Sequence, residues 1–216
     1  MLSFVEEIVL LRLDDTHGRF VDLPSSASGI VLAGAALMEL ALRNRVDSDL
    51  ERLIVVDARP TGDEILDDAL AHLAAAPGTR NIAGAIDLIS GKADLYQEKA
   101  LRRLIEKGVL REVDGRFLWV FHTRRYPVVD DSEQREVKAR LRELLLGDEI
   151  PESRDIALTC LIDACGLLGL VLNAEETHRV AARVEQLDKM DLIGQAMRRA
   201  VEEIRFIVSH VAQPMH

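Results

Sequence analysis

Apolar residues recur at helical spacing along most of the chain, and this pattern predicts a mainly α fold. Helices are expected over residues 3–13, 82–89, 93–107, 132–146, 156–172, 174–187 and 191–211, with another between Thr61 and Pro77. A long helix is also expected from the small polar loop Ser25–Gly29 to about residue 45, and its apolar residues on most faces are typical of a helix at the centre of a core. Thr61, followed three residues later by Glu64, predicts a capping box at the start of the helix before Pro77.

Two short regions have strand character instead. Leu53–Val56 is continuous and rich in β-branched residues, so it is expected to form a short strand. Asp114-Gly115 separates two apolar runs, and this signal predicts a β-hairpin. The expected strands cover 109–112 and 117–121, and the expected turn covers 113–116.

The second strand of this hairpin is apolar at five consecutive positions. A strand with one exposed face normally alternates, so such a run places large side chains on both faces. Either the helices bury both faces, or one face inserts into a bilayer or pairs with another subunit. The candidate contact residues are Phe117, Leu118, Trp119, Val120 and Phe121.

The overall charge is acidic, at −10, and a charge of that sign opposes binding to nucleic acid and to anionic membranes. Basic residues are nevertheless concentrated between Lys92 and Arg125, where nine Lys/Arg and five Asp/Glu give a local charge of +4. This region is either a solvated helix face or a site for an anionic headgroup or phosphate. The candidate headgroup contacts are Lys99, Arg102, Arg103, Arg124 and Arg125.

No arrangement of residues predicts catalysis. The six histidines are scattered, and the chain has no metal-site spacing, glycine-rich phosphate loop or nucleophile elbow. Adjacent carboxylates such as Asp67 and Asp68 point about 100° apart on a helix, so they form no acid–base pair. We therefore expect no enzyme, no cofactor and no metal. Ser25–Gly29 either caps the helix that follows it or presents free N–H groups to an anion.

Other features predict a soluble cytoplasmic protein. Cys160 and Cys165 are five residues apart in an apolar helix and point in different directions, so they are expected to be buried and unbridged. Ile156–Leu172 is the most membrane-like stretch, but its 17 residues include Asp163, so a buried core helix is expected. Residues 1–7 lack the basic region of a signal peptide.

Several segments, taken in order, resemble the Golgi phosphoprotein 3 family over nearly the whole chain. They are Glu6–Leu11, Leu37–Arg45, Pro60–Leu70, Leu104–Leu110, Phe117–Phe121 and Tyr126-Pro127. Pro-Thr-Gly-Asp before a helix, together with Glu-Lys-Gly-Val-Leu before a hairpin, is fairly specific in combination. The chain has no long N-terminal extension of the eukaryotic kind, which favours a bacterial member.

The resemblance implies a single compact helical domain over residues 1–216, with a short β-strand region and a protruding hydrophobic β-hairpin. It also implies a non-enzymatic protein located peripherally at a membrane surface. Eukaryotic members bind phosphatidylinositol 4-phosphate and act as adaptors that retain Golgi enzymes, and their hairpin is tied to oligomerisation. The implied partners are therefore an anionic lipid headgroup and further copies of this chain, with no nucleic acid.

The headgroup pocket of eukaryotic members uses a Trp and an Arg near the start of the long early helix, and an Arg pair on the helix before the hairpin. Here the Trp position falls near Leu23 or Pro24, and the early Arg position falls on Ala33. The Arg pair falls on Asp94 and Gln97. The prediction is therefore an anionic-lipid-binding adaptor that does not retain the eukaryotic headgroup pocket.

Two alternative functions remain open. The hairpin could make a homo-oligomerising protein-interaction module that binds no lipid. A helix ending at Glu106-Lys107-Gly108 before a hairpin also resembles a winged helix, in which the wing contacts DNA. The acidic charge of the chain argues against a DNA binder, as does Leu95–Glu98, which has few side chains able to read bases.

Overall fold

The computed structural model describes residues 1–14, 17–21, 23, 25–49, 52–75, 81–117, 121–147, 151–188 and 195–211. These residues form a mainly α structure with short antiparallel sheets, which confirms the predicted fold class. The first half comprises α1 (Phe4–Leu11), α2 (Ser25–Leu42), β1 (Val46–Ser48), β2 (Leu53–Val55), α3 (Glu64–Ala75), α4 (Ile82–Ser90) and α5 (Ala93–Glu106). The second half comprises β3 (Val113–Phe117), β4 (Phe121–Arg125), α6 (Ser132–Leu146), α7 (Ser153–Ala164), the 3₁₀ helix η1 (Leu168–Leu170), α8 (Ala174–Asp188) and α9 (Gln195–Val211).

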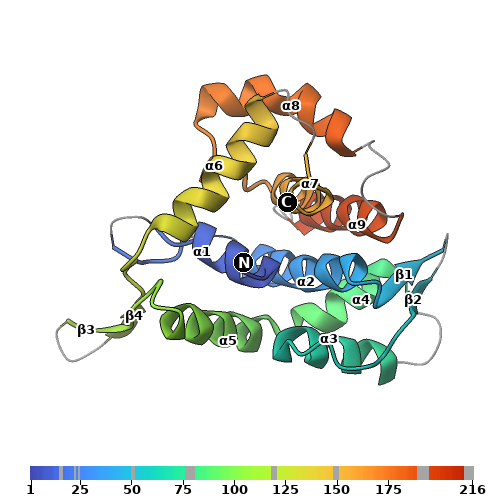
Figure 1. Cartoon of the computed structure of the whole chain (residues 1–216), viewed down its shortest axis with the longest axis horizontal. Helices are drawn as coiled ribbons and strands as arrows, with labels where there is room; N and C mark the ends of the chain where they lie inside the picture. The colour runs from blue at the N-terminus through green and yellow to red at the C-terminus, as the bar shows by residue number, and fades with distance from the viewer. Residues whose placement is uncertain are drawn as a thin grey trace.

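Helix α2 is the centre of the fold, as its apolar sequence predicts. Every residue from 30 to 40 is buried. The helix packs against α3, α4 and α5 on one side and against α7 and α9 on the other, and Figure 1 shows α1 and α2 as the middle layer. Gly34 permits the close approach, because a Cβ added there would lie 2.6 Å from Ile204 and 2.7 Å from Leu161.

Helix α1 is buried along its whole length, including two carboxylates. Its start is a capping box, in which Ser3 Oγ accepts from the Glu6 N–H and the Glu6 carboxylate accepts from the Ser3 N–H. Glu7 is 1% exposed and accepts hydrogen bonds from Arg140 of α6 at 2.8 Å and Arg154 of α7 at 3.0 Å. Burial nevertheless raises the pKa of Glu7. A buried carboxylate needs such partners, so these ion pairs fix α1 against α6 and α7.

The predicted hairpin is present, but its predicted turn and strand limits are wrong. Strands β3 and β4 pair antiparallel, from Val113 opposite Arg125 to Phe117 opposite Phe121. Asp114-Gly115 therefore lies inside β3 rather than in the turn. The apolar run consequently spans the end of the hairpin instead of forming one of its strands.

The register of the hairpin is fixed at its base. Leu110, which is buried in the core, pairs with Val128, and the same register continues along β3 and β4. A register anchored by a core residue outweighs the local Asp-Gly turn signal. Residues 118–120, which connect the strands and include Trp119, lie outside the described residues, as do the side chains of Phe117 and Phe121.

The start of α3 also differs from the predicted capping box. The carboxylate of Asp63 caps the helix, because it accepts hydrogen bonds from the N–H groups of Ile65 at 2.8 Å and Leu66 at 3.2 Å. Thr61 instead donates its hydroxyl to Asp67 at 2.6 Å. An ionised carboxylate is a stronger acceptor than a hydroxyl, which explains why Asp63 takes the cap position.

The apolar stretch over 156–172 forms α7 and η1, and Gly166 between them has a φ of +70°. Helix α7 is buried on nearly all sides, which confirms the predicted core helix. Cys160 and Cys165 are buried and form no disulfide, as predicted. Within the described parts of the chain, no helix combines the length and the apolar character that crossing a membrane requires.

Candidate functional site

The basic residues predicted on α5 lie together and meet the start of α3. Lys99 Nζ is 3.4 Å from one Glu64 oxygen, and Arg102 Nη2 is 3.0 Å from the other. Arg103 donates two hydrogen bonds to the Asp63 carboxylate, at 2.7 and 3.1 Å. The structure therefore brings three of the predicted headgroup contacts together, but each of them is paired with a carboxylate.

The two carboxylates hold these cations with different strength. Burial acts to raise the pKa of Asp63, but hydrogen bonds from Arg103 and two backbone N–H groups outweigh it, so the pKa lies below its usual range. The side chains of this pair are only 13% and 18% exposed. Glu64 is 43% exposed, and exposed ion pairs contribute no more than about 1 kcal/mol. An incoming anion would therefore displace Glu64 more easily than Asp63.

The other predicted headgroup contacts come from β4. Arg125 is half-buried, and its Nε is enclosed without a hydrogen-bond partner among the described residues. The side chain of Arg124 lies outside the described residues. A backbone hydrogen bond of 3.1 Å from Arg111 to Pro127 ties the base of the hairpin together, and Figure 1 shows the hairpin directly beyond the end of α5. The basic helix and the hairpin thus form one continuous edge.

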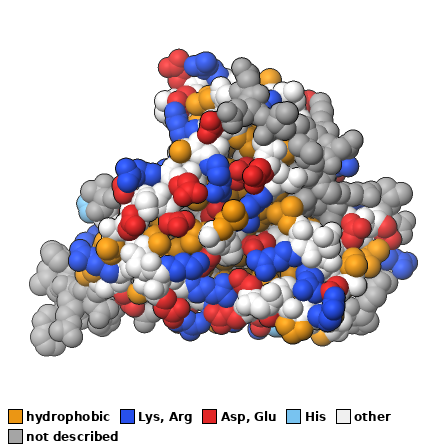
Figure 2. Space-filling model, viewed as in Figure 1, with side chains coloured by type: hydrophobic (Ala, Val, Ile, Leu, Met, Phe, Trp, Pro, Cys, Tyr) orange, Lys and Arg blue, Asp and Glu red, His pale blue; other side chains and the backbone are white. Residues whose placement is uncertain are grey.

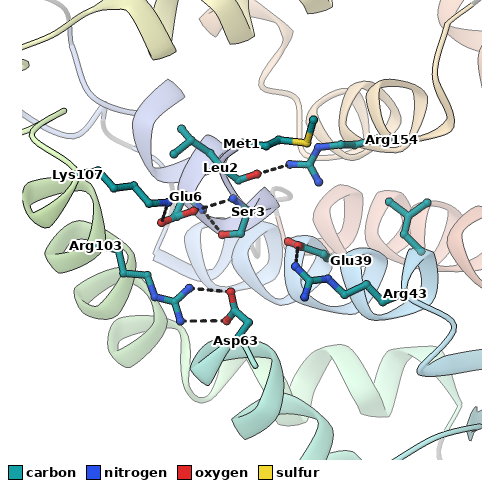
Figure 3. A pocket seen from close by; sticks show the side chains of 11 residues that line it. Met1, Leu2, Ser3, Glu6, Glu39, Arg43, Asp63, Arg103, Lys107 and Arg154 are labelled. Atoms are coloured by element: carbon teal, nitrogen blue, oxygen red, sulfur yellow. Dashed lines mark hydrogen bonds and ion pairs between the residues drawn. The ribbon is translucent and has the colours of Figure 1, made fainter. Parts of the chain in front are cut away.

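A charged cavity of about 430 Å³ adjoins the Asp63–Arg103 pair (Figure 3). It is lined by Met1, Leu2, Ser3, Glu6, Glu39, Leu42, Arg43, Asp63, Arg103, Lys107 and Arg154. Its buried carboxylates are both paired, since Glu6 lies 2.6 Å from Lys107 and Glu39 lies 2.6 Å from Arg43. Figure 2 shows acidic and basic side chains interspersed over this face of the molecule. The arginine and lysine side chains of the cavity are thus already paired with carboxylates and present little open positive charge to an anion.

Arg12, at the end of α1, was not among the predicted contacts. It is 4% exposed, and its Nη1 donates to Ser28 Oγ at 2.8 Å and to Gln97 Oε1 at 3.4 Å. Its guanidinium lies over the Phe20 ring, 5.2 Å from the centroid. No carboxylate among the described residues pairs with it, and burial lowers the pKa of Arg12. Its spacing of four residues from Ile8 predicts that Arg12 is buried, because residues i and i+4 lie on the same side of a helix.

The positions aligned with the eukaryotic headgroup pocket differ in their exposure to solvent. Ala33 is fully buried, Leu23 and Gln97 are half-buried, and Asp94 is exposed. Pro24 lies outside the described residues. Among these side chains only Gln97 can donate a hydrogen bond from an N–H group. In the part of the chain that the structure describes, no cluster of three or more His, Cys, Asp or Glu is arranged to hold a metal ion.

Two comparisons with known proteins cover most of the chain. Residues 4–204 match the family model of Golgi phosphoprotein 3 (GPP34). The chain is also 31% identical, over 225 residues, to vacuolar protein sorting-associated protein 74 of Eremothecium gossypii, and this alignment covers 86% of the chain and 67% of that protein. The family match includes α5, the hairpin and the central helix α2. The chain therefore belongs to the Golgi phosphoprotein 3 (GPP34) family.

Proposed function

We propose that this protein is a non-enzymatic peripheral membrane adaptor that binds anionic lipid headgroups, with residues 1–216 acting as one domain. Membership of the Golgi phosphoprotein 3 family supports a lipid-binding adaptor. One observation carries the proposal: the hairpin whose end contains the apolar run Phe117–Phe121 extends directly from the basic helix α5. An apolar element beside cations is the arrangement that an anionic membrane surface favours.

Both parts of this edge are needed for binding in this account. Removing a large apolar side chain from water contributes about 1.5–3 kcal/mol. A Lys or Arg close to an anionic membrane contributes about 1 kcal/mol. The proposed cations are Lys99, Arg102, Arg103, Arg124 and Arg125, and the carboxylates of Asp63 and Glu64 reduce the contribution of the first three. The net charge of −10 opposes binding through other faces, so contact is confined to this edge.

The proposed adaptor differs from eukaryotic members in how it recognises the headgroup. Ala33, Asp94 and Gln97 supply no cation at the positions aligned with the eukaryotic arginines. Selection of phosphatidylinositol 4-phosphate by that residue set is therefore not expected here. Attraction to anionic lipids in general, followed by insertion of the hairpin, is the proposed mode of binding.

Vesicle co-sedimentation tests this function. The protein should sediment with vesicles that contain anionic phospholipid and remain in solution with phosphatidylcholine alone. Trp119→Ala should lose most of the binding, because it removes the largest apolar side chain of the run. Phe206→Ala, which removes an aromatic side chain that is 58% exposed on α9, is the matched control and should bind normally. If Trp119→Ala binds as the parent does, the proposed insertion of the hairpin is wrong.

The same apolar run supports a second candidate function, a homo-oligomerising interaction module without lipid binding. Light scattering separates the two, since this alternative requires an oligomer that Trp119→Ala dissociates. A monomer at high concentration would exclude it. The winged-helix alternative has weaker support, because Lys99, Arg102 and Arg103 are paired with carboxylates rather than open to DNA. A gel shift at low salt would test it.

A further inference from the structure

Strands β1 and β2 form a small sheet at the end of the molecule opposite the hairpin β3–β4 (Figure 1). Residues along an antiparallel strand alternate between those that bond to the neighbouring strand and those that point away from it. Val56 N–H donates to Arg45 O at 2.8 Å, so Ile54, two residues earlier in β2, also bonds to β1. The N–H and C=O groups of Leu53 and Val55 consequently point to the outer edge of β2.

This outer edge has backbone groups to offer to another strand. Among the described residues, nothing accepts a hydrogen bond from the N–H of Leu53 or Val55. Proteins commonly protect such an edge with Lys, Pro or inward-pointing charges, because it can otherwise pair with another chain. Strand β2 consists of Leu53, Ile54 and Val55 and carries none of these features. Its outer edge is therefore suited to adding a strand.

The exposed face of β2 is apolar as well. Ile54 is 45% exposed and Val56 is 60% exposed, whereas the side chains of Leu53 and Val55 pack against the core. Ile54 and Val56 lie on the same face, since they are two residues apart. Contacts between β-branched side chains on neighbouring strands stabilise a sheet. An added strand would therefore gain side-chain contacts together with backbone hydrogen bonds.

We propose that β2 pairs antiparallel with β2 of a second copy of this chain, which joins the two small sheets across a two-fold axis. In this register Ile54 of one copy lies opposite Ile54 of the other. The N–H and C=O groups of Leu53 then bond to those of Val55 in the second copy, so every outward group of both strands is paired. A register centred on Val55 would instead need the Asp57 N–H, which already donates to Arg45 O at 3.2 Å.

The charge around β2 suits a second copy of this acidic chain. From Arg45 to Arg59 the sequence has three Arg and four Asp/Glu, a net of −1, whereas the whole chain carries −10. Two copies therefore repel each other least at this end. Arg52 is exposed and forms no ion pair with a described carboxylate. In the proposed register it lies opposite Val56 of the second copy, beside Asp57, whose carboxylate is held there by Arg45.

Disulfide cross-linking of the full chain tests this register. Directly opposed residues that do not exchange hydrogen bonds have Cα atoms about 4.5 Å apart, which a disulfide can bridge. Ile54→Cys should therefore form a covalent dimer on mild oxidation, while the native Cys160 and Cys165 are buried. Asp47→Cys, at an exposed position of β1 in the same sheet, is the matched control and should form little. Equal yields from both variants would overturn the proposal.

Sedimentation velocity of charged variants tests the same contact without a covalent bond. The parent should associate reversibly at high concentration, because the contact is small. Ile54→Lys and Ile54→Glu should each lose association, since like charges then lie opposite one another, and an equal mixture of the two should recover it. Val129→Lys, at a valine that is 61% exposed, should associate as the parent does. A monomeric parent, or Ile54→Lys that associates normally, would contradict the proposal.

Trp119→Ala separates this surface from the hairpin. Because β2 lies at the opposite end of the molecule, Ile54→Cys should cross-link equally well with and without Trp119→Ala. Loss of the cross-link in the double variant would mean that copies meet through the hairpin and that the proposal is wrong. A cross-link in a protein that binds no vesicles would contradict the proposed function and leave the pairing of β2 supported.

Discussion

The cations of α5 and the cation of Arg12 lie on neighbouring helices, yet their surroundings differ in charge. Arg102 and Arg103 meet Glu64 and Asp63, so that edge of the molecule is largely neutralised. Arg12 is more deeply buried and meets only neutral oxygens among the described residues. A cluster of basic residues in the sequence is thus a poor guide to an open anion site. Whether a cation is open to an anion depends on whether the fold places a carboxylate beside it.

The two regions also differ in what they contribute to the fold. The Asp63–Arg103 pair joins the start of α3 to α5 through two hydrogen bonds and supports a helix cap at the same time. Arg12 joins α1 to α2 and α5 through one nitrogen, and its Nε has no acceptor in the part of the chain that the structure describes. In this account the paired region stabilises the structure, whereas the unpaired buried cation reduces its stability.

The largest expected effect is the loss of Asp63. Asp63→Ala removes a helix cap, at about 1 kcal/mol, and charge-assisted hydrogen bonds to Arg103, at about 1.5–3 kcal/mol. The free energy of unfolding in urea should therefore fall by about 3 kcal/mol. Asp94→Ala, at the exposed acidic residue of the first turn of α5, should change it by less than about 0.5 kcal/mol. Equal effects of both substitutions would mean that the Asp63 pair has no special role.

A pH series isolates the charge of Asp63 from its cap. Asp63→Asn keeps an N-cap acceptor but loses the ionised carboxylate, so it should be less stable than the parent by about 1.5 kcal/mol at pH 7. The folded-state pKa of Asp63 lies below its usual value. The extra stability of the parent is therefore present above about pH 4, near the unfolded pKa, and is lost as the pH falls through the folded pKa. Urea unfolding from neutral to acidic pH measures this difference, and a difference independent of pH would contradict the account.

A carboxylate partner for Arg12 should raise the free energy of unfolding, the opposite of the effect of Asp63→Ala. Gln97→Glu should raise it by about 1 kcal/mol, because a charged acceptor replaces a neutral one beside a buried cation. Gln186→Glu is a matched control, since Gln186 also accepts from an arginine, Arg183, but is exposed. The control should change the free energy of unfolding by no more than about 0.5 kcal/mol. A destabilised Gln97→Glu would show that Arg12 does not lack negative charge.

The smallest effect is expected at the exposed carboxylate of the paired region. Glu64→Gln releases Lys99 and Arg102, so binding to anionic vesicles should strengthen about two- to threefold, the size expected of exposed ion pairs. Glu98→Gln changes the net charge equally at an exposed position of α5, the helix that carries Lys99 and Arg102. Co-sedimentation should show little change for this control. Equal gains in both variants would indicate a general effect of net charge rather than release of the α5 cations.

The sequence predicts most helices of this fold because their signals are local. The apolar character of α2 and α7 follows from spacing alone, as does the burial of Cys160 in α7 and of Cys165 at its C-cap. Strand β1 was not predicted, because its Val46–Ser48 segment has three residues and no alternation long enough to recognise. The hairpin register was also mispredicted, since the pairing of Leu110 with Val128 lies outside the local turn signal.

The candidate site was harder to predict than the fold, because its partners are distant in the sequence. The basic residues of α5 are visible as a cluster, but Arg103 meets Asp63 from 40 residues away. Arg12 reaches Gln97 across 85 residues. Helical spacing can place Arg12 beside the buried Ile8, but it cannot show that no carboxylate among the described residues pairs with it. Whether a cation is paired with a carboxylate depends on the packed structure, and the α5 region and the Arg12 region differ in this respect.

Urea unfolding tests the central contrast most directly, by comparing the parent with Arg12→Gln and Arg103→Gln. Each variant removes one cation, from the unpaired and the paired region respectively. The account predicts a large loss of stability in Arg103→Gln, because the half-buried Asp63 carboxylate loses its charge-assisted hydrogen bonds. It predicts a smaller loss in Arg12→Gln, which leaves no carboxylate among the described residues without its partner. A larger loss in Arg12→Gln than in Arg103→Gln would contradict the account.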